Sequence, residues 1–547
     1  MRSAKRPSGW GGIKLLCVIL ALALAAAACG SDADETADPD ESTSESTPDD
    51  GDDHADEQHE DGAPSDDAEE AVSGGTLTIA TAADAQPNAV LATREGNNLW
   101  RRQVFDTLTS VNRETGQPDP LLATDWEWVE DGDSWKMVIQ LREGVTFHTG
   151  REFTAEDVIF TFDKQVLPES ASQTAPVLKR ASSWEATGTH EVTIFADNPV
   201  GNIFDAFALA VILDSETFDG LADGTQVVGT GPFMWEEWQP GSSLSLVKNP
   251  NYWQQGQPAL EAVEYAIIPD ATALVAAMQS ERAQVVFSLP TLDAQLLLED
   301  DRFAPLVVPG PIFPLGMDIT QAPFDQVQVR QAVGYAIDRD RIVDQVFQGA
   351  ADPSVLFWKT EEPGMDDSYA YRYSYDPELA QQMIEDAGVD GTSIELLTLN
   401  IPVVISVAEI VQNNLNEAGL DVTLNVMDTA QFDERQAAGD LGPIFQQIHG
   451  LNLSAASLVD AYPALRDGNP SQLTDPLYRE LRDDLQAATD EQGYATALQA
   501  LADFMLDEVH SLSVLRGEAI NVQTANLSGV VYTAEGVMIL ADAAFTE

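Results

Sequence analysis

The chain has 547 residues, of which 44% are hydrophobic, so it is long enough to bury several domains' worth of core. It carries 91 Asp and Glu against 27 Lys and Arg, a formal net charge of −64. A chain this negative repels nucleic acid and acidic lipid headgroups. Its charge therefore argues against a function that depends on binding either of them electrostatically.

The first 29 residues have the pattern of a lipoprotein signal peptide. Four basic residues lie within residues 1–14, and residues 15–28 are almost purely apolar. This order predicts a secretory signal, and the apolar run is shorter than the ~20 residues that span a bilayer. The run ends at Ala-Ala-Ala-Cys29-Gly, which resembles a lipoprotein cleavage site. Because Cys17 would leave with the signal, Cys29 has no disulfide partner, and a lipid anchor is a better interpretation than a free thiol.

Residues 30–73 are expected to form an acidic disordered tether. Residues 31–70 contain 19 Asp and Glu and no Lys or Arg, so they repel one another and cannot bury a core. His54 and His59 lie in this stretch, and we interpret them as solvated residues because they lack the fixed geometry of a metal site. Without the tether and the signal, 72 acidic residues remain against 23 basic ones, so the folded part is itself acidic.

The rest of the chain alternates between strand and helix patterns. Strands are predicted at 74–80, 141–148, 263–268 and 422–426, and helices at 98–108, 154–163, 271–278, 329–337 and 407–420. This alternation favours an α/β fold. Trp126 and Trp128 alternate along a further strand pattern, which favours packing over a sugar-stacking platform.

The stretch 141–163 combines several local signals. Val145 and Phe147 alternate with polar residues, which predicts a half-buried strand. Thr154 and Asp157 have the spacing of a capping box, so a helix should begin there. Strand, turn and capped helix are structural features, and no residue in this stretch is placed for chemistry.

This stretch and four others resemble signatures of the family 5 solute-binding proteins, the receptors of ABC importers. The string LREGVTFHTGREFTAEDVIFTFD is similar to the family's Arg-x-Gly-Val-x-Phe-His-x-Gly run and the acidic helix start that follows it. Further matches occur, in the family's order, at 229–253, 323–339, 375–388 and 407–426. The resemblance therefore extends over the whole chain after Gly74.

The resemblance implies an α/β fold of the type II periplasmic-binding-protein class, with two main lobes, an additional smaller subdomain and a cleft between the lobes. The predicted organisation is a lipoprotein signal peptide (1–29), a tether (30–73), a large lobe in three pieces (74–117, 229–312 and 516–547), a small subdomain (118–228) and a distal lobe (313–515).

The implied function is capture of a peptide or similar small solute in the cleft, and its delivery to the permease subunits of an importer. We expect a protein held at the outer face of the cell membrane by a lipid on Cys29, with no cofactor and no catalysis. A nickel-binding receptor is an alternative, with His148 or His449 as ligands, although a lone histidine is more often hydrogen-bonded filler. A structural adhesin without a closable cleft is another.

A secreted hydrolase is the main rival class. Gly-x-Ser-x-Gly, His-Glu-x-x-His and phosphate-loop motifs do not occur in the sequence. The pair Ser245 and Lys248 has Ser-x-x-Lys spacing, but it falls in an alternating strand that points the two side chains in opposite directions.

The segment 448–455 matches the region where an Asp of peptide-binding relatives pairs with the solute's amino group. It contains no acidic residue, so the resemblance favours an uncharged or weakly charged solute over a zwitterionic peptide. Candidate binding residues near strand ends and crossing segments are Asp84, Met317, Phe357, Trp358, Asn400, His449, Gly450 and Asn452.

Overall fold

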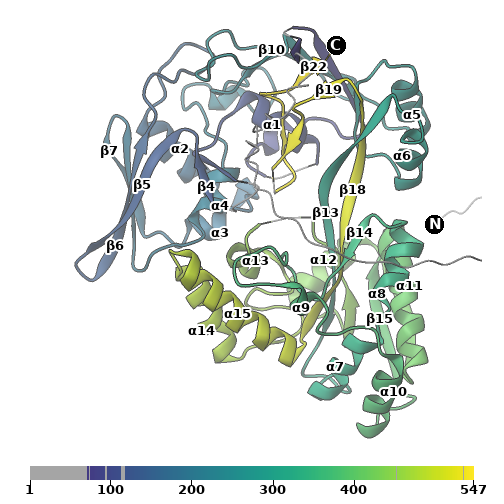
Figure 1. Ribbon diagram of the computed structural model, residues 1–547. Coiled ribbons are helices and arrows are strands. Elements are labelled where there is room, and N and C mark those ends of the chain that lie inside the picture. Colours follow the sequence, from purple (N-terminus) through teal and green to yellow (C-terminus); the bar gives the residue numbers. More distant parts are fainter. Residues whose placement is uncertain are drawn as a thin grey trace, which may run out of the picture. The chain divides into compact units, whose positions relative to one another are not determined.

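The computed structural model describes residues 71–72, 74–92, 95–112, 117–450, 453–533 and 535–546 (Figure 1). These residues belong to one compact unit. The expected signal peptide, most of the tether and Cys29 lie outside the described residues, and so does Asn452. Within the described part, no helix is both long and apolar enough to cross a bilayer.

A mixed sheet of eleven strands runs through the described residues in the order β16-β15-β17-β13-β18-β12-β2-β11-β10-β9, with β14 paired beside β18. The strands are β2 (Thr76–Thr81), β9 (Phe233–Gln239), β10 (Ser243–Lys248), β11 (Ala262–Ile267), β12 (Val285–Val286), β13 (Phe303–Met317), β14 (Ala351–Pro353), β15 (Ser393–Leu399), β16 (Asp421–Met427), β17 (Ile444–Gln446) and β18 (Ser511–Thr524).

The strands β13 and β18 connect the two parts of this sheet. They pair antiparallel from Phe303 opposite Thr524 to Gly316 opposite Ser511, and they lie side by side in Figure 1. At the Thr524 end β18 also pairs with β12, whereas at the Gly316 end β13 pairs with β17. The chain therefore crosses from one part of the sheet to the other within a single pair of strands.

The pairing of β13 and β18 is irregular at its middle. The register shifts between Pro309 and Ile312 and again between Ile312 and Pro314. Proline has no N–H to donate, so it interrupts a ladder of hydrogen bonds. A Cβ on Gly310 would lie 2.6 Å from the carbonyl oxygen of Gly517, so the two backbones can approach this closely only at glycine.

A second, antiparallel sheet has the order β5-β6-β8-β7. Its strands are β5 (Ala123–Asp131), β6 (Ser134–Leu141), β7 (Ser183–Gly188) and β8 (Glu191–Ala196), and it shares a hydrophobic cluster with α2 (Ala155–Gln165), α3 (Ala175–Leu178) and α4 (Ile203–Leu209). Trp126 and Trp128 lie on β5 and pack partly buried against this cluster, which confirms their predicted packing role.

Further helices surround the main sheet. They are α1 (Glu95–Val104), α5 (Ala271–Gln279), α6 (Thr291–Leu297), α7 (Val327–Ala336), α8 (Arg339–Ile342), α9 (Asp367–Ala370), α10 (Pro377–Asp386), α11 (Pro402–Glu417), α12 (Thr429–Ala438), α13 (Ala455–Ala461), α14 (Pro476–Ala487) and α15 (Glu491–Glu508). Short strands complete the described elements: β1 (Ala71–Val72), β3 (Thr109–Val111), β4 (Pro118–Pro120), β19 (Leu527–Ser528), β20 (Val531–Tyr532), β21 (Met538–Ile539) and β22 (Ala544–Thr546).

The buried apolar side chains form separate clusters. One draws on residues 108–212, a second on three stretches (77–105, 211–308 and 527–543), and a third on residues 312–515 together with Leu209 and Val537. We call them the small, large and distal clusters. The domain boundaries given above stay predictions.

The capped helix predicted from the sequence is confirmed as α2. The Thr154 backbone N–H donates to the Asp157 carboxylate at 3.1 Å. The Arg151 guanidinium donates to Asp157 and to Asp214 at 2.6 Å each, and Asp157 is fully buried. The acidic residue of the motif therefore neutralises an arginine as well as capping a helix.

The strand predicted at 141–148 is wrong. Strand β6 ends at Leu141, and the following residues form only an isolated bridge between Thr146 and Glu152. Gly144 and Gly150 have φ values of 77° and 85°, so the chain turns twice within a few residues and cannot extend. Val145 and Phe147 are both buried, as the alternating pattern predicted, but they lie in a loop and not in a strand.

Two other boundaries also differ from those predicted. The helix expected at 98–108 ends at Val104. Strand pairing begins with Ala71 and Val72 against β22, ahead of Gly74, so the last residues assigned to the tether are paired. Phe105 and Leu108 are buried beyond the end of that helix, because burial does not require a regular backbone.

His148 holds the turn at Gly229–Gly231. Its ring Nε2 lies 3.0 Å from the carbonyl oxygen of Gly231, and its backbone N–H donates to the Gly229 carbonyl at 2.9 Å. A Cβ on Gly229 would lie 2.1 Å from the Val104 carbonyl oxygen. Two of the sequence motifs therefore meet in three dimensions as scaffold.

Replacing Gly229 with Ala should destabilise the fold, because the new Cβ could escape the Val104 carbonyl only if the backbone moved. We expect the free energy of unfolding to fall by about 2 kcal/mol or more, measured by urea denaturation. Gly493→Ala is the matched control: its Cβ would meet only Asp490, at 3.5 Å or more, within α15, and no loss is expected. Equal stabilities of the two variants would contradict the scaffold role of this turn.

Candidate functional site

Helix α4 carries a buried carboxylate in an otherwise apolar stretch. Asp205 is 8% exposed, and its Oδ2 accepts a hydrogen bond from Ser454 Oγ at 2.5 Å. Burial raises the pKa of Asp205, while hydrogen bonds from Ser454 and Ser457 oppose the rise. Asp205 lies on a helix of the small cluster. It is thus hydrogen-bonded to Ser454, the residue before α13, and α13 belongs to the distal cluster.

The contact between α4 and α13 is close. The Asn202 amide Nδ2, at the start of α4, donates to Ser457 Oγ at 2.9 Å and to the Ala456 carbonyl at 3.3 Å. The Gly201 backbone N–H donates to the Gln486 carbonyl of α14 at 2.9 Å. Polar groups therefore dominate this junction, whereas apolar side chains fill the clusters on both sides.

A second carboxylate, Glu362, reaches the same segment from a different loop. Its Oε2 accepts a hydrogen bond from the Tyr494 hydroxyl of α15 at 2.7 Å. Burial raises the pKa of Glu362 to about 7; the bonds from Tyr494 and from the Ala455 backbone oppose this rise, and the negative charge of Asp205 adds to it. The pKa of Tyr494 is raised in turn by its burial and by Glu362.

Asp205 lies close enough for its negative charge to raise the pKa of Glu362. Two neighbouring buried acids cannot both ionise without an energetic cost, unless a positive group lies nearby. Arg516 on β18 is the cation that the structure places beside Glu362, and it lowers the pKa of that carboxyl. The Arg516 Nη2 also donates to the Phe357 carbonyl at 2.9 Å.

Aromatic side chains lie on the distal side of this cluster. The His449 ring stacks on Tyr462, with centroids 4.7 Å apart and planes inclined by 19°, and Phe357 meets Tyr462 edge-on at 6.3 Å. Burial lowers the pKa of His449 to about 4, and Arg466 acts in the same direction. His449 is therefore a neutral stacking ring at physiological pH.

Four of the predicted binding residues belong to the distal part of the structure. Phe357 and His449 both contact Tyr462. Trp358 is 2% exposed, and its indole N–H has no hydrogen-bond partner among the described residues. Met317 is fully buried at the end of β13, inside the distal cluster.

The other predicted residues have different surroundings. The Asp84 carboxylate accepts hydrogen bonds from the Trp238 indole at 3.0 Å and from the Gly241 N–H at 2.7 Å, so it serves a local structural purpose. Asn400 is exposed, and Gly450 is exposed with no heavy atom within 4 Å of the position that a Cβ would take. Asn452 falls outside the described residues.

Sequence reasoning missed Asp205 and Glu362. The inference of an uncharged or weakly charged solute depended on the lack of an acid within 448–455, and it stays a prediction. The structure brings two acids to this segment from elsewhere in the chain. Asp205 had a signal, a lone acid in the apolar run Ile203–Leu209. Glu362 had none, because it lies in a polar loop.

Within the described part of the chain, no three His, Cys, Asp or Glu side chains are grouped so that they could hold a metal ion. His148 is engaged by the Gly229–Gly231 turn, and burial lowers its pKa. The Nε2 of His449 has no hydrogen-bond partner among the described residues, but His449 belongs to no group of three possible metal ligands there.

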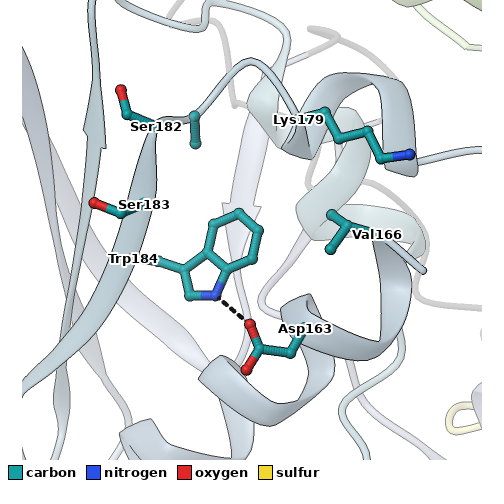
Figure 2. Close-up of a pocket in the computed structure, with 7 residues that line it drawn as sticks. Asp163, Val166, Lys179, Ser182, Ser183 and Trp184 are labelled. Carbon is teal, nitrogen blue, oxygen red and sulfur yellow. Dashed lines mark hydrogen bonds between the residues drawn. The ribbon is translucent and has the colours of Figure 1, made fainter.

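The structure also has two open surface pockets away from these acids. One has a volume of about 430 Å³ on the small cluster, where the Trp184 indole donates to Asp163 at 2.9 Å and Lys179 stands at the rim (Figure 2). The other, of about 490 Å³, lies beside α5 and α6. Asp163 and Lys179 line the first pocket, Glu299, Asp300 and Arg302 line the second, and neither lining includes Asp205 or Glu362.

The model of one protein family matches residues 117–468, well over half of the chain; its description is "Bacterial extracellular solute-binding proteins, family 5 Middle". The chain belongs to this family. The resemblance drawn from the sequence motifs is thereby confirmed. The family consists of extracellular solute-binding proteins, so its common role is binding for transport.

Named relatives of this family 5 protein bind different solutes. Heme-binding protein A of Haemophilus influenzae is 27% identical over 384 residues, which cover 63% of this chain and 68% of that protein. Glutathione-binding protein GsiB of Pectobacterium atrosepticum is 28% identical over 322 residues, which cover 57% and 61%. The chain thus spans about three-fifths of GsiB's length.

A solved structure shows the same fold. It is the ABC transporter-associated periplasmic binding protein DppA of Helicobacter pylori in complex with the peptide STSA, with a TM-score of 0.68, 18% identity, and coverage of 87% of this chain and 99% of that one. The α/β fold of the type II periplasmic-binding-protein class, predicted from the sequence, is confirmed.

Glu362 should make the stability of the protein depend on pH. Its raised pKa means that the folded protein binds more protons than the unfolded chain between about pH 4.5 and about pH 7, so its contribution to stability falls as pH rises through this window. Glu362→Gln, which keeps an acceptor for Tyr494, should be the more stable form above pH 7 by up to about 3 kcal/mol. Urea denaturation of both proteins at several pH values measures the difference, and a difference that is constant from pH 4.5 to 8 would contradict the assignment.

Proposed function

We propose that this family 5 protein is the solute receptor of an ABC importer, and that it binds a peptide or similar small solute through a protonated amine held by Asp205 and Glu362. The observation that supports this best is the convergence of the two carboxylates on the segment 453–461. They come from separate parts of the chain, and both are bonded to residues at the start of α13 or directly beside it.

The physical reason is the cost of burying two negative charges together. Burial raises the pKa of both carboxyls, and their hydrogen bonds offset this rise only in part. An ammonium group between them would offset this cost and would gain charge-assisted hydrogen bonds. The names of the relatives fit this class of solute, since one binds glutathione and another was solved with a peptide.

The site also has walls suited to a small organic solute. Phe357, Trp358, Tyr462 and the neutral His449 supply flat, largely apolar faces near the charged pair. Binding sites for small molecules commonly combine such walls with a few polar groups that fix the orientation of the ligand. No observation favours a hydrolase or a nickel receptor, so we do not propose either.

We further propose that Cys29 carries a lipid and that the acidic stretch after it holds the folded part at the outer face of the membrane, where the permease subunits take up the solute. This part of the proposal rests on the signal-like sequence before Cys29 and on the 19 acidic residues that follow it.

Solute binding should raise the thermal stability of the protein, because a ligand of the folded state alone stabilises that state. Protein purified from its own host should carry a small amine-bearing molecule detectable by native mass spectrometry, and a defined set of di- to pentapeptides should raise its melting temperature. Asp205→Asn should lose this shift, whereas Asp433→Asn, an exposed residue of α12, should keep it. No shift and no co-purifying molecule would refute the receptor proposal.

The lipid anchor can be tested separately. Cys29→Ala should release the protein from the membrane fraction into the medium or the soluble envelope fraction, because no thiol remains to be acylated. Cys17→Ala, inside the apolar run, is the matched control and should remain membrane-bound. Persistent membrane attachment of the Cys29→Ala protein would contradict acylation at this residue.

A further inference from the structure

Residues 108–212, which we call the small part, touch residues 312–515, the distal part, through a glycine. A Cβ on Gly201 would lie 1.8 Å from the Ala488 carbonyl oxygen and 3.2 Å from that of Gln486. The nearest heavy atoms to this position all belong to residues 486–488, at the end of α14. Gly201 has no left-handed φ that would require a glycine. A small residue at position 201 therefore serves the contact with α14 and not the local backbone.

Gln486 of α14 bonds to both parts at once. Its Nε2 donates to the Asp460 carboxylate at 2.7 Å and to the Ala456 carbonyl at 3.0 Å, both on α13 of the distal part. Its Oε1 accepts a hydrogen bond from the Arg180 guanidinium, and its backbone carbonyl accepts one from the Gly201 N–H at 2.9 Å. The amide nitrogen is thus satisfied within the distal part, and both oxygen atoms bond to the small part.

This division of partners lets the contact open and close without rearranging Gln486. If the two parts separated, Asp460 and Ala456 would still hold the side chain in place, and water could bond to its oxygen atoms. Arg180 is only half-buried, so its guanidinium would also gain water. Gln486 is therefore a preformed acceptor, and neither part leaves a buried polar group unpaired there when the two separate.

The small and distal parts are not consecutive in the chain. The chain passes from one to the other through residues of the large cluster, although α3 lies against α13 in space (Figure 1). Among the described residues, Leu209 is the one buried side chain of 108–212 that the distal cluster includes. A contact with so little shared apolar surface is held mainly by its hydrogen bonds, so a small free-energy difference decides whether it is open or closed.

The irregular middle of β13 and β18 gives the distal part a place to move. The distal part begins within β13 and ends within β18. The pairing of these strands shifts its register between Pro309 and Pro314. A change of backbone angles in this short segment would carry the distal part away from the small part as one body.

We propose that Gly201, Arg180 and Gln486 form a latch that sets how firmly the small and distal parts close on each other, whatever the chemistry of the solute. The inference rests on the proposed receptor function and specifies its regulation. The latch joins protein to protein, whereas Asp205 and Glu362 hold the solute. A receptor that is closed for only a fraction of the time binds every solute more weakly by that same fraction. The latch therefore sets one common affinity factor, and the solute site sets the preference between solutes.

Gly201→Ala tests the latch sterically. The new Cβ cannot coexist with the Ala488 carbonyl at its present position, so the two parts should stay apart while each keeps its own packing. Hydrogen–deuterium exchange of the mature protein without solute should become faster in residues 199–206 and 484–490, and stay unchanged in α2 and α11. Gly493→Ala, whose Cβ would meet only Asp490, is the matched control and should exchange like the wild-type protein.

Arg180→Met removes one bond of the latch and introduces no clash. Every di- to pentapeptide that binds the wild-type protein should bind this variant more weakly by one common factor of about threefold to tenfold, because one partly exposed hydrogen bond is lost. Isothermal titration calorimetry measures the affinities. Lys179→Met is the matched control, since Lys179 is the exposed neighbouring cation at the rim of the pocket in Figure 2, and the affinities should not change.

Unchanged exchange at the junction in Gly201→Ala would overturn the latch, because the contact would then not form in solution. Faster exchange throughout all clusters, with a lower melting temperature than that of Gly493→Ala, would overturn it by showing a fixed part of the fold. Losses in Arg180→Met that are absent, or that differ between peptides, would do the same. If no peptide binds the wild-type protein, the peptide-like solute is refuted, and the exchange experiment alone decides on the latch.

Discussion

The antiparallel pairing of β13 with β18 is the constraint on which the rest of the structure depends. These two strands carry the main sheet from the part that contains β2 and β12 to the part that contains β15 and β17. Their middle segment holds the register shifts, prolines and the close approach of Gly310 to Gly517. The two strands pair regularly at both ends and irregularly in the middle. They therefore join the two well-packed parts of the sheet through a short, less regular segment.

Polar contacts dominate at the junction of α4 with α13, where the clusters meet. Asn202 and Asp205 bond to the residues around Ser454 and Ser457, and Glu362 reaches the same place through Tyr494. Buried polar and charged groups contribute less to stability than apolar ones of the same volume, and they lose heavily when a partner is missing. The polar groups at this junction can recognise a ligand chemically, but they stabilise the fold less than apolar groups would. This combination suits a binding site.

The fold could be predicted well from the sequence because its signals are local. The Thr154 and Asp157 capping pair and the helix around Arg330 act through neighbouring backbone, and each forms the structure expected. The turn at Gly229–Gly231 also forms, although its close contact with Val104 is distant in sequence. The error at 141–148 has the same origin. The pattern describes only which side chains are buried. Val145 and Phe147 are buried, but the chain around them turns at Gly144 and Gly150 and forms a loop.

The candidate site could be predicted only in part. Phe357, Trp358 and His449 lie beside the proposed site, and aromatic residues near strand ends are visible in a sequence. The hydrogen bond of Asp84 to Trp238, which is 154 residues away, could not be read from the sequence. Composition, signal pattern and motif order were enough to determine the family and the α/β fold. Only the tertiary structure decided that Asp205 and Glu362 meet at the start of α13, because electrostatic interaction depends on distance in space and these residues come from separate stretches of chain.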